Sequence, residues 1–316
     1  MSTKLSDARS LSSIPFVPRR LFVNRLNDGF YEVSAYVRLD VEDGERPDHI
    51  EWETADPHSG YQMRSRTPVS AQATGPSIPV RIVAVLPPSW KRGTLTVHAP
   101  SAGPSLRYSI AIEQFSHQRA FILPLAGYAL TAMGHRIGEA HRAALEIPSQ
   151  QFGWDFLGLG ADGLSIVHLP TQGSLCASDF PGFGSDVIAP ADGRVCAARD
   201  DQQDAWEAGR LPQDVKAYQA DLTLALGNYV ILDHGDGIWS VMAHLKEGSL
   251  QVTVGQDVIV GEVLGSLGNS GSSSGPHIHF HFMDGPDILT ASPLPVMLTL
   301  EDGVFAPQAG DIVSNS

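Results

Sequence analysis

The stretch GSSSGPHIHFHF, residues 271–282, decides the fold of the C-terminal half of the chain. A loop of glycine and serine leads into His277, His279 and His281, which alternate with other residues. In a β-strand successive side chains point to opposite faces, so the three histidines would share one face, with neighbouring side chains roughly 6–7 Å apart. Such a row can hold a metal and act beside it, and it can also be the polar outer face of an ordinary strand. The rest of the sequence has to separate these two interpretations.

A second segment upstream favours the metal site. GNYVILDHGDGIWSVMAHL, residues 227–245, reads as two strands around an Asp-Gly turn and ends at His244. A neighbouring hairpin can place His244 beside His277 across the sheet. Catalytic zinc is usually bound by three protein ligands, histidines with a carboxylate. The residues therefore predict a His/His/Asp metal site in the C-terminal half.

Two further segments resemble each other. VIAPADGRVCAARD (187–200) and VTVGQDVIVGEVLGSLG (252–268) each contain a strand, a glycine-containing turn and a second strand, which is typical of a hairpin. Two such hairpins packed face to face predict a compact antiparallel barrel-sandwich. The polar residues 200–222 between them are expected to form a surface excursion.

The chain as a whole is predicted to be mainly β. Residues 1–15 are expected to be flexible, and the short β-branched and aromatic runs of residues 16–120 predict a small β-sandwich without chemistry-bearing clusters. A C-terminal domain is expected over residues 121–300, with a short helix around 136–146, followed by a C-terminal tail over 301–316.

Composition excludes several classes of protein. The 316 residues are 42% hydrophobic and carry a net charge of −14 without a Lys/Arg cluster, so nucleic acid is not an expected partner. No apolar run reaches the ~20 residues of a transmembrane helix. The N-terminus lacks the apolar core of a secretory signal, which taken literally predicts a cytoplasmic protein. Cys176 and Cys196 form no CxxC pair and are expected to be inert thiols, with a disulfide as the less favoured alternative.

Four blocks occur in a characteristic order: QFGWD (151–155), VIAPADGRV (187–195), AHL (243–245) and GNSG…GPHIHF (268–280). They resemble the core of the lysostaphin/LytM-type zinc metallopeptidases, which cut peptide cross-links in bacterial cell walls. The resemblance covers roughly residues 130–290. It implies that residues 121–300 form a LytM-type metallopeptidase domain with the duplicated hybrid motif fold and one Zn²⁺ per chain.

The resemblance also implies individual roles. The family's aspartate ligand falls on Asp155, and the second histidine of its HxH pair, also a zinc ligand, falls on His279. The first histidine of that pair, here His277, and the histidine of the AHL block, here His244, are implied to be catalytic. Zinc would lower the pKa of a bound water and polarise the scissile carbonyl, while the two catalytic histidines accept a proton and stabilise the oxyanion.

The sequence departs from the family pattern at the first zinc ligand. Many relatives have HxGxD, but the histidine position is occupied here by Gln151, and an amide is a poor zinc ligand. A subset of the family takes this ligand from an earlier segment, which offers His141 and His135. His141 is favoured because its shorter tether reaches Asp155 more easily; His135, or a site that has lost this ligand, are the alternatives.

Another departure is His281, which replaces a residue that is often Glu or Gln in relatives. We expect it to support a neighbouring residue or to lie on the surface rather than to bind the metal.

The resulting functional hypothesis is a zinc metalloendopeptidase that acts on peptides of peptidoglycan, located by family in the cell envelope or outside the cell. One alternative is a catalytically degenerate metallopeptidase-like scaffold that binds or regulates. Another is a carrier module on the same barrel-sandwich arrangement. The sequence leaves open the exact cross-link, the compartment, the role of residues 16–120 and the oligomeric state.

Overall fold

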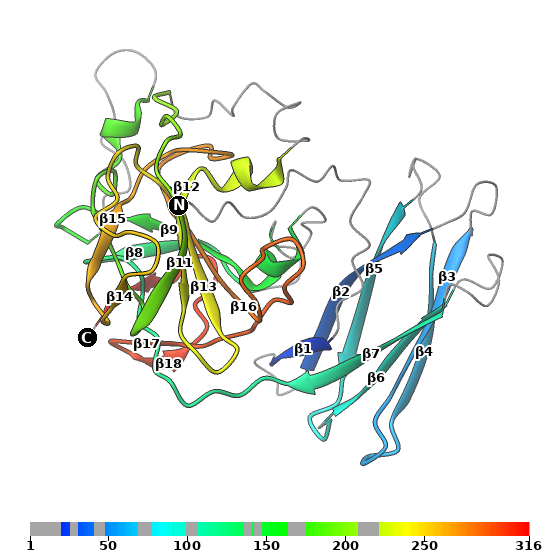
Figure 1. Ribbon diagram of the computed structural model, residues 1–316. Helices are drawn as coiled ribbons and strands as arrows, with labels where there is room; N and C mark the ends of the chain where they lie inside the picture. The colour runs from blue at the N-terminus through cyan, green and yellow to red at the C-terminus, as the bar shows by residue number, and fades with distance from the viewer. Residues whose placement is uncertain are drawn as a thin grey trace.

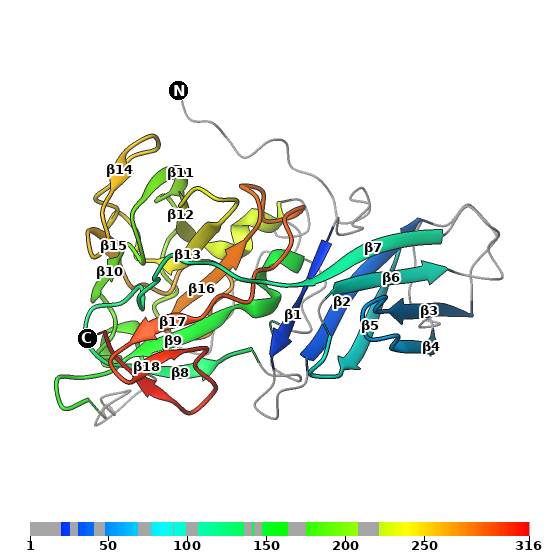
Figure 2. The same cartoon turned by 90° about the horizontal axis from the view of Figure 1, so that it is seen from below.

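The computed structural model in Figure 1 describes residues 20–25, 31–40, 48–68, 77–90, 92–98, 107–135, 141, 147–163, 175–207 and 221–315. The structure is mainly β, as the sequence predicted, and within the described residues the strand pairs are antiparallel except for that of β1 with β7. Strands β1–β7 form an N-terminal lobe, and β8–β19 form a C-terminal lobe (Figures 1 and 2). No helix in the described part of the chain is long and apolar enough to cross a membrane. Residues 1–15, expected to be flexible, lie outside the described residues.

The N-terminal lobe is a seven-stranded sheet with the order β4-β3-β6-β7-β1-β2-β5. Its strands are β1 (Arg20–Arg25), β2 (Tyr31–Asp40), β3 (His49–Ala55), β4 (Gln62–Pro68), β5 (Ser77–Leu86), β6 (Arg92–His98) and β7 (Arg107–Gln114). The first part of β1 pairs in parallel with β7, and its last two residues pair antiparallel with β2. The sheet therefore divides at β1 into a two-stranded and a four-stranded part. The β-sandwich expected for residues 16–120 stays a prediction.

The C-terminal lobe is built on an eight-stranded sheet with the order β14-β11-β12-β13-β16-β9-β8-β19. Its strands are β8 (Ala129–Met133), β9 (Trp154–Gly158), β11 (Gly193–Arg199), β12 (Asn228–Asp233), β13 (Trp239–Leu245), β14 (Asp257–Val258), β16 (Ile278–Met283) and β19 (Ile312–Val313). Strands β12 and β13 form the hairpin predicted for residues 227–245. Strand β16, which carries the histidine row, lies in the middle of the sheet between β13 and β9 (Figure 2).

Two small sheets complete this lobe. They are formed by β10 (Asp186–Ile188) with β15 (Val263–Ser266), and by β17 (Leu298–Leu300) with β18 (Gly303–Phe305). The two resembling segments do not form the predicted hairpins, because β10 pairs with β15 and β11 pairs with β14. The two strands of each segment therefore pair with strands of the other segment, because the turn between them sends them into different sheets.

Helical structure in the described residues is limited to short pieces. The 3₁₀ helices are η4 (Pro148–Phe152), η5 (Ala177–Asp179) and η6 (Leu222–Leu226). Of the short helix predicted around residues 136–146, only His141 is described, and it is helical. Residues 208–220 of the expected surface excursion also lie outside the described part. The described start of that excursion is anchored, because Asp204 accepts hydrogen bonds from the backbone N–H groups of Glu247 and Asn269.

The core of the C-terminal lobe lies on one face of β16. Ile278, Phe280 and Phe282 point into a cluster of buried apolar side chains that includes Trp154 and Phe156 of β9. The opposite face of β16, with His279 and His281, is buried as well. The histidine row is therefore not the polar outer face of an ordinary strand.

The expected C-terminal tail over residues 301–316 is wrong for the described residues. Strand β19 pairs with β8, and the side chain of Asn315 both accepts a hydrogen bond from the N–H of Leu123 and donates one to its carbonyl. Val313 is buried in the core. A two-residue strand has no periodicity that the sequence could show, because its conformation is set by the distant strand with which it pairs.

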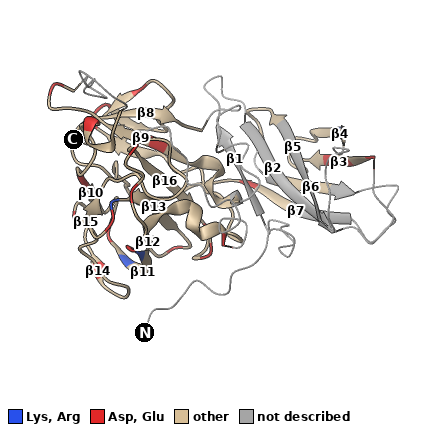
Figure 3. Cartoon of the chain, turned by 90° about the horizontal axis from the view of Figure 1, so that it is seen from above, with Lys and Arg blue, Asp and Glu red and all other residues tan. Residues whose placement is uncertain are grey.

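Cys176 and Cys196 form no disulfide bond. Burial raises the pKa of the Cys196 thiol to about 11, and the thiol donates a hydrogen bond to the carbonyl of Ile231. It is therefore an unreactive thiol, as expected. Figure 3 shows Asp and Glu residues distributed over loops and both lobes rather than gathered on one element.

Candidate metal centre

Strand pairing brings Asp155 and His279 face to face. In the ladder between β9 and β16, Asp155 lies directly opposite His279. The neighbours of Asp155 in β9, Trp154 and Phe156, point into the core, so the alternation of the strand turns the carboxylate to the other face. The indole of Trp154 donates a hydrogen bond to the carbonyl of Pro307, which anchors β9 at this point.

His141 joins this pair from the segment before η4. Its Nε2 lies 2.9 Å from Oδ1 of Asp155, and Nδ1 of His279 lies 3.1 Å from the same oxygen. The three ligand atoms lie within 4.8 Å of one another, and the side chain of His279 is only 2% exposed. Two imidazole nitrogens that converge with one carboxylate oxygen are a donor set that suits Zn²⁺. The residues present therefore fit the metal that the sequence predicted.

Glycine at position 153 allows this convergence. A Cβ there would lie 2.8 Å from the carbonyl oxygen of Gln150 and 2.9 Å from Cε1 of His279. It would also meet Cδ2 of His141 at 3.5 Å. A side chain at this position would therefore crowd the imidazole of His279 and the carbonyl of Gln150, and it would only touch the ring of His141.

The alternative ligand, His135, is not part of the cluster. It is buried, and its ring stacks on the indole of Trp154 with 4.1 Å between the ring centroids. Gln151, at the position where relatives have the first ligand, is buried in η4. The structure thus brings His141, rather than His135, together with Asp155 and His279.

His277 and His244 lie beside the three candidate ligands. The centroids of their rings are 4.7 Å apart, and Nε2 of His277 lies 3.5 Å from Oδ1 of Asp155. Nδ1 of His277 bonds the carbonyl of Gly275 at 2.8 Å, and Nδ1 of His244 bonds the carbonyl of Ser270 at 2.8 Å. Because a carbonyl only accepts, Nδ1 carries the proton in both rings. Nε2 of each is therefore the nitrogen that is left to act.

His244 owes its direction to a β-bulge. The register between β12 and β13 shifts so that Asn228 pairs with Leu245 and Tyr229 pairs with Ala243, which leaves His244 as the extra residue. Its φ of 64° lies in the left-handed region, which is strained for a histidine by an estimated ~1–3 kcal/mol. Bulges commonly re-aim a side chain next to an active site. The side chain of His244 thereby leaves the alternation of β13 and turns towards His277.

The electrostatics of the cluster centre on one carboxylate. Burial alone would raise the pKa of Asp155, but the adjacent His277 and His141 hold it well below its usual range. Burial lowers the pKa of His279 to about 4, assisted by His141, and it also lowers the pKa of His244. For His277 the lowering effect of burial is outweighed by the charge of Asp155, which raises its pKa. A neutral imidazole at His279 beside an ionised carboxylate at Asp155 is the protonation state in which these two residues can bind a metal cation.

His281 lies behind His279 and not on the surface. It is fully buried, and its Nδ1 is 2.9 Å from Nε2 of His279. On its other side, Nε2 of His281 is 3.3 Å from the hydroxyl of Ser149 in η4. The surface alternative for His281 is thus wrong. Ser149 was missed because a serine in a polar stretch carries no sequence signal for such a contact.

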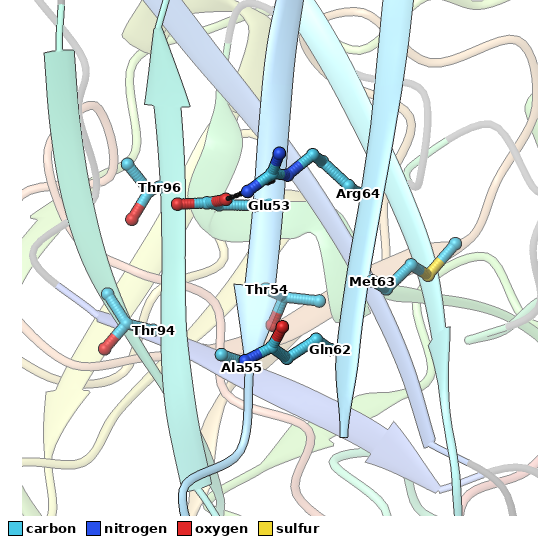
Figure 4. Close-up of a pocket in the computed structure, with 8 residues that line it drawn as sticks. All are labelled: Glu53, Thr54, Ala55, Gln62, Met63, Arg64, Thr94 and Thr96. Atoms are coloured by element: carbon cyan, nitrogen blue, oxygen red, sulfur yellow. Dashed lines mark hydrogen bonds and ion pairs between the residues drawn. The ribbon is translucent and has the colours of Figure 1, made fainter. Parts of the chain in front are cut away.

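A pocket lies elsewhere, on the N-terminal sheet (Figure 4). It is lined by Glu53, Thr54, Ala55, Gln62, Met63, Arg64, Thr94 and Thr96, and the guanidinium of Arg64 forms an ion pair with Glu53 at 2.9 Å. None of its lining residues is a histidine or cysteine, and it belongs to a different sheet from the histidine cluster. Within the described residues, the candidate metal ligands and the two histidines beside them lie in the C-terminal lobe instead.

Comparison with known proteins finds a family match within the C-terminal lobe. Residues 177–289 match the sequence model of a family described as peptidase family M23. The chain carries a peptidase M23 domain. The segment matched to peptidase family M23 contains His244, His277 and His279, whereas Asp155 and His141 precede it. The two remaining candidate ligands are therefore brought to the M23 segment by the fold.

Individual relatives are similar over part of the chain. An uncharacterized metalloprotease of Haemophilus influenzae is 36% identical over 99 residues, which are 31% of this chain and 16% of that protein. The match thus spans less than a fifth of the length of this curated relative.

Two solved structures are similar at low identity. The catalytic domain of the antimicrobial peptidase lysostaphin from Staphylococcus simulans is 19% identical, with 53% of this chain and 88% of that chain covered and a TM-score of 0.29. A zinc-containing peptidase from Vibrio cholerae is 13% identical, with 87% and 83% covered and a TM-score of 0.33. At such identities and TM-scores these likenesses say nothing of activity.

Proposed function

We propose that the chain is a zinc metalloendopeptidase that hydrolyses peptide bonds in the cross-link peptides of peptidoglycan. The observation that carries the proposal is the convergence of His141, Asp155 and His279 beside two histidines with an available Nε2. These three residues would hold Zn²⁺, which as a Lewis acid polarises a carbonyl and lowers the pKa of water. Peptidoglycan lies outside the cytoplasmic membrane, so the proposal includes action in the cell envelope or outside the cell.

His244 and His277 would perform the proton transfers. Nε2 of one ring accepts a proton from the attacking water as its oxygen bonds to the carbonyl carbon, and this proton then passes to the nitrogen of the leaving amine. The other ring, protonated at Nε2, donates a hydrogen bond to the carbonyl oxygen as it gains negative charge. His244 is buried and the side chain of His277 is 14% exposed, and a low local dielectric strengthens such interactions.

The place of His141 supports an enzyme over a degenerate scaffold. The scaffold hypothesis rested on Gln151, which removes a ligand from the usual position. Nε2 of His141 offers a third donor 2.9 Å from Asp155, so His141, Asp155 and His279 would together supply the three protein ligands that catalytic zinc sites use. A carrier module would need no such carboxylate. The choice of peptidoglycan as substrate is supported by the peptidase M23 match and by the motif order, not by the site geometry.

The proposal is tested with the purified full chain. Zinc content is measured by metal analysis, and hydrolysis by the release of new amino groups from peptidoglycan and from a synthetic cross-linked peptide. We expect about one zinc per chain and zinc-dependent cleavage. His279→Ala should lose both, whereas His58→Ala, a change at an exposed histidine in the N-terminal lobe, should lose neither. Zinc-loaded protein that binds these substrates without cleaving them would establish the scaffold instead.

A further inference from the structure

A chain of buried hydrogen bonds leads away from the candidate metal centre. Nε2 of His279 lies 2.9 Å from Nδ1 of His281. Nε2 of His281 lies 3.3 Å from Oγ of Ser149, whose hydroxyl donates to the carbonyl oxygen of Ile288 at 2.8 Å. His279, His281 and Ser149 are all buried. Solvent therefore does not compete for these bonds.

The carbonyl of Ile288 fixes the direction of every hydrogen bond in this series. A carbonyl oxygen can only accept, so the single hydroxyl proton of Ser149 is used on Ile288. Oγ of Ser149 must then accept from Nε2–H of His281. In a neutral imidazole the other nitrogen is an acceptor, so Nδ1 of His281 receives the Nε2–H of His279.

The direction of these hydrogen bonds determines which nitrogen of His279 is without a proton. With its proton on Nε2, His279 presents the lone pair of Nδ1 to Oδ1 of Asp155, 3.1 Å away. Two lone pairs that face each other at this distance repel, and a cation between them removes the repulsion. A histidine that binds a metal through Nδ1 needs this nitrogen to be unprotonated and directed at the other ligands.

We propose that His281 and Ser149 are positioning residues that hold His279 in the tautomer and orientation that bind the metal through Nδ1. The proposal rests on the metal site of the proposed function. The two residues act through His279 and do not themselves reach the metal or the substrate. Hydrogen bonds from a ligating histidine to such partners typically change metal affinity ~10–100-fold.

The position of Ser149 makes the chain a link between the two ligand-bearing elements. Ser149 belongs to η4, which ends at Gly153 just before Asp155 in β9, whereas His281 follows His279 in β16. The hydrogen bonds therefore link the orientation of His279 to η4, the element that precedes Asp155. A buried polar pair costs free energy unless its hydrogen bonds are complete, so apolar residues would fill the same space at lower cost if packing were the only role.

The test measures the affinity of the full chain for zinc alone, by competition with a chromophoric chelator. His281→Phe fills the space but cannot accept from His279, and Ser149→Ala removes the acceptor for His281. We expect both to weaken zinc binding, His281→Phe by ~10–100-fold. His281→Gln can accept with its Oε1 and donate with its amide, so it should restore affinity close to that of the wild type.

A matched pair of controls separates positioning from packing. His234 is also a buried histidine, with its Nε2 2.7 Å from the buried hydroxyl of Ser240, but neither residue contacts the metal centre. His234→Phe and Ser240→Ala should therefore leave zinc affinity unchanged, even where they lower the melting temperature.

A spectroscopic signal reports the hydrogen bond directly. In the zinc-loaded protein the Nε2–H proton of His279 should give a low-field NMR signal that exchanges slowly with water, because it is buried and bonded to His281. The signal should lose its low-field shift or its protection in His281→Phe and keep both in His281→Gln. If His281→Phe does not fold, Ser149→Ala provides the same comparison.

The outcomes are distinct from those of the proposed function. Wild-type zinc affinity in both His281→Phe and Ser149→Ala would overturn the positioning role, as would an equal loss in the His234 and Ser240 controls. If zinc affinity falls as expected but no peptide is cleaved by the wild type, the positioning role stands and the peptidase proposal fails. A wild-type chain that binds no zinc would overturn both.

Discussion

The rings of His244 and His277 lie with their centroids 4.7 Å apart, although His244 is the extra residue of a β-bulge and His277 ends a glycine- and serine-rich loop. Each ring is held by a hydrogen bond from Nδ1 to a backbone carbonyl. Neither is a member of the candidate ligand set His141, Asp155 and His279. This separation between groups that would hold the metal and groups that would move protons makes the proposed function testable residue by residue.

Removal of either proton-transfer group should affect hydrolysis and not metal content. We expect His244→Ala and His277→Ala to retain about one zinc, and each to lower the rate of peptide hydrolysis by ~100–10,000-fold. The double variant should lose less than the product of the two single effects, because both groups act on one transition state. Metal analysis and steady-state kinetics on the same preparations check this. Loss of zinc in either single variant would make that histidine a ligand instead.

The first zinc ligand can be identified by comparing two histidines. His141→Ala should lose zinc, because its Nε2 lies 2.9 Å from Asp155 in the candidate ligand set. His135→Phe should keep zinc, because the new ring preserves the stacking on Trp154. Zinc retained in His141→Ala and lost in His135→Phe would transfer the role to His135. Retention in both would point to a two-ligand site.

Gly153 should be intolerant of a methyl group. In Gly153→Ala the Cβ would lie 2.9 Å from Cε1 of His279, and overpacking of this kind costs ~1–3 kcal/mol. Because the displaced ring is a candidate ligand, we expect zinc affinity to fall about tenfold or more. Gly285→Ala is the matched control, because its Cβ would meet only the Cβ of Ala291 at an ordinary 3.6 Å. Equal zinc affinity in both variants would contradict the close approach at Gly153.

The buried His234 should make stability depend on pH. Burial lowers its pKa from 6.5 to about 4. The unfolded chain therefore binds more protons than the folded chain between these values, and stability rises with pH across this window and is lost as pH falls. Lowering the pKa of His234 by this amount reduces the free energy of unfolding by on the order of 3 kcal/mol as the pH falls through the whole window.

The measurement is urea unfolding of the metal-free protein across this pH window. His234→Gln should be less stable than the wild type above the window, and its stability should fall less steeply with acidification. The exposed His58→Gln serves as a control and should keep the wild-type slope. An unchanged slope in His234→Gln would show that burial of His234 does not control this part of the pH dependence.

The hairpin of β12 and β13 and the shared face of the histidine row were predictable from the sequence. Both depend on local periodicity: alternating residues in a strand face alternate sides, and an Asp-Gly turn reverses the chain. The order of the motif blocks further predicted the peptidase M23 domain, to which residues 177–289 match. In contrast, the predicted hairpins at 187–200 and 252–268 were wrong, because a strand–turn–strand pattern does not state which strand is the partner.

The sequence by itself thus determined the β class, the position of the histidine row and the set of residues from which a metal site could be built. Tertiary structure decided which of them meet. It brought His141 rather than His135 to Asp155, turned His244 out of its strand through a bulge, and placed Ser149 against His281, 132 residues away. The physical reason is that periodicity and turn chemistry act over a few residues, whereas contacts between distant segments depend on how strands pair and on which side chains then fill the space between them.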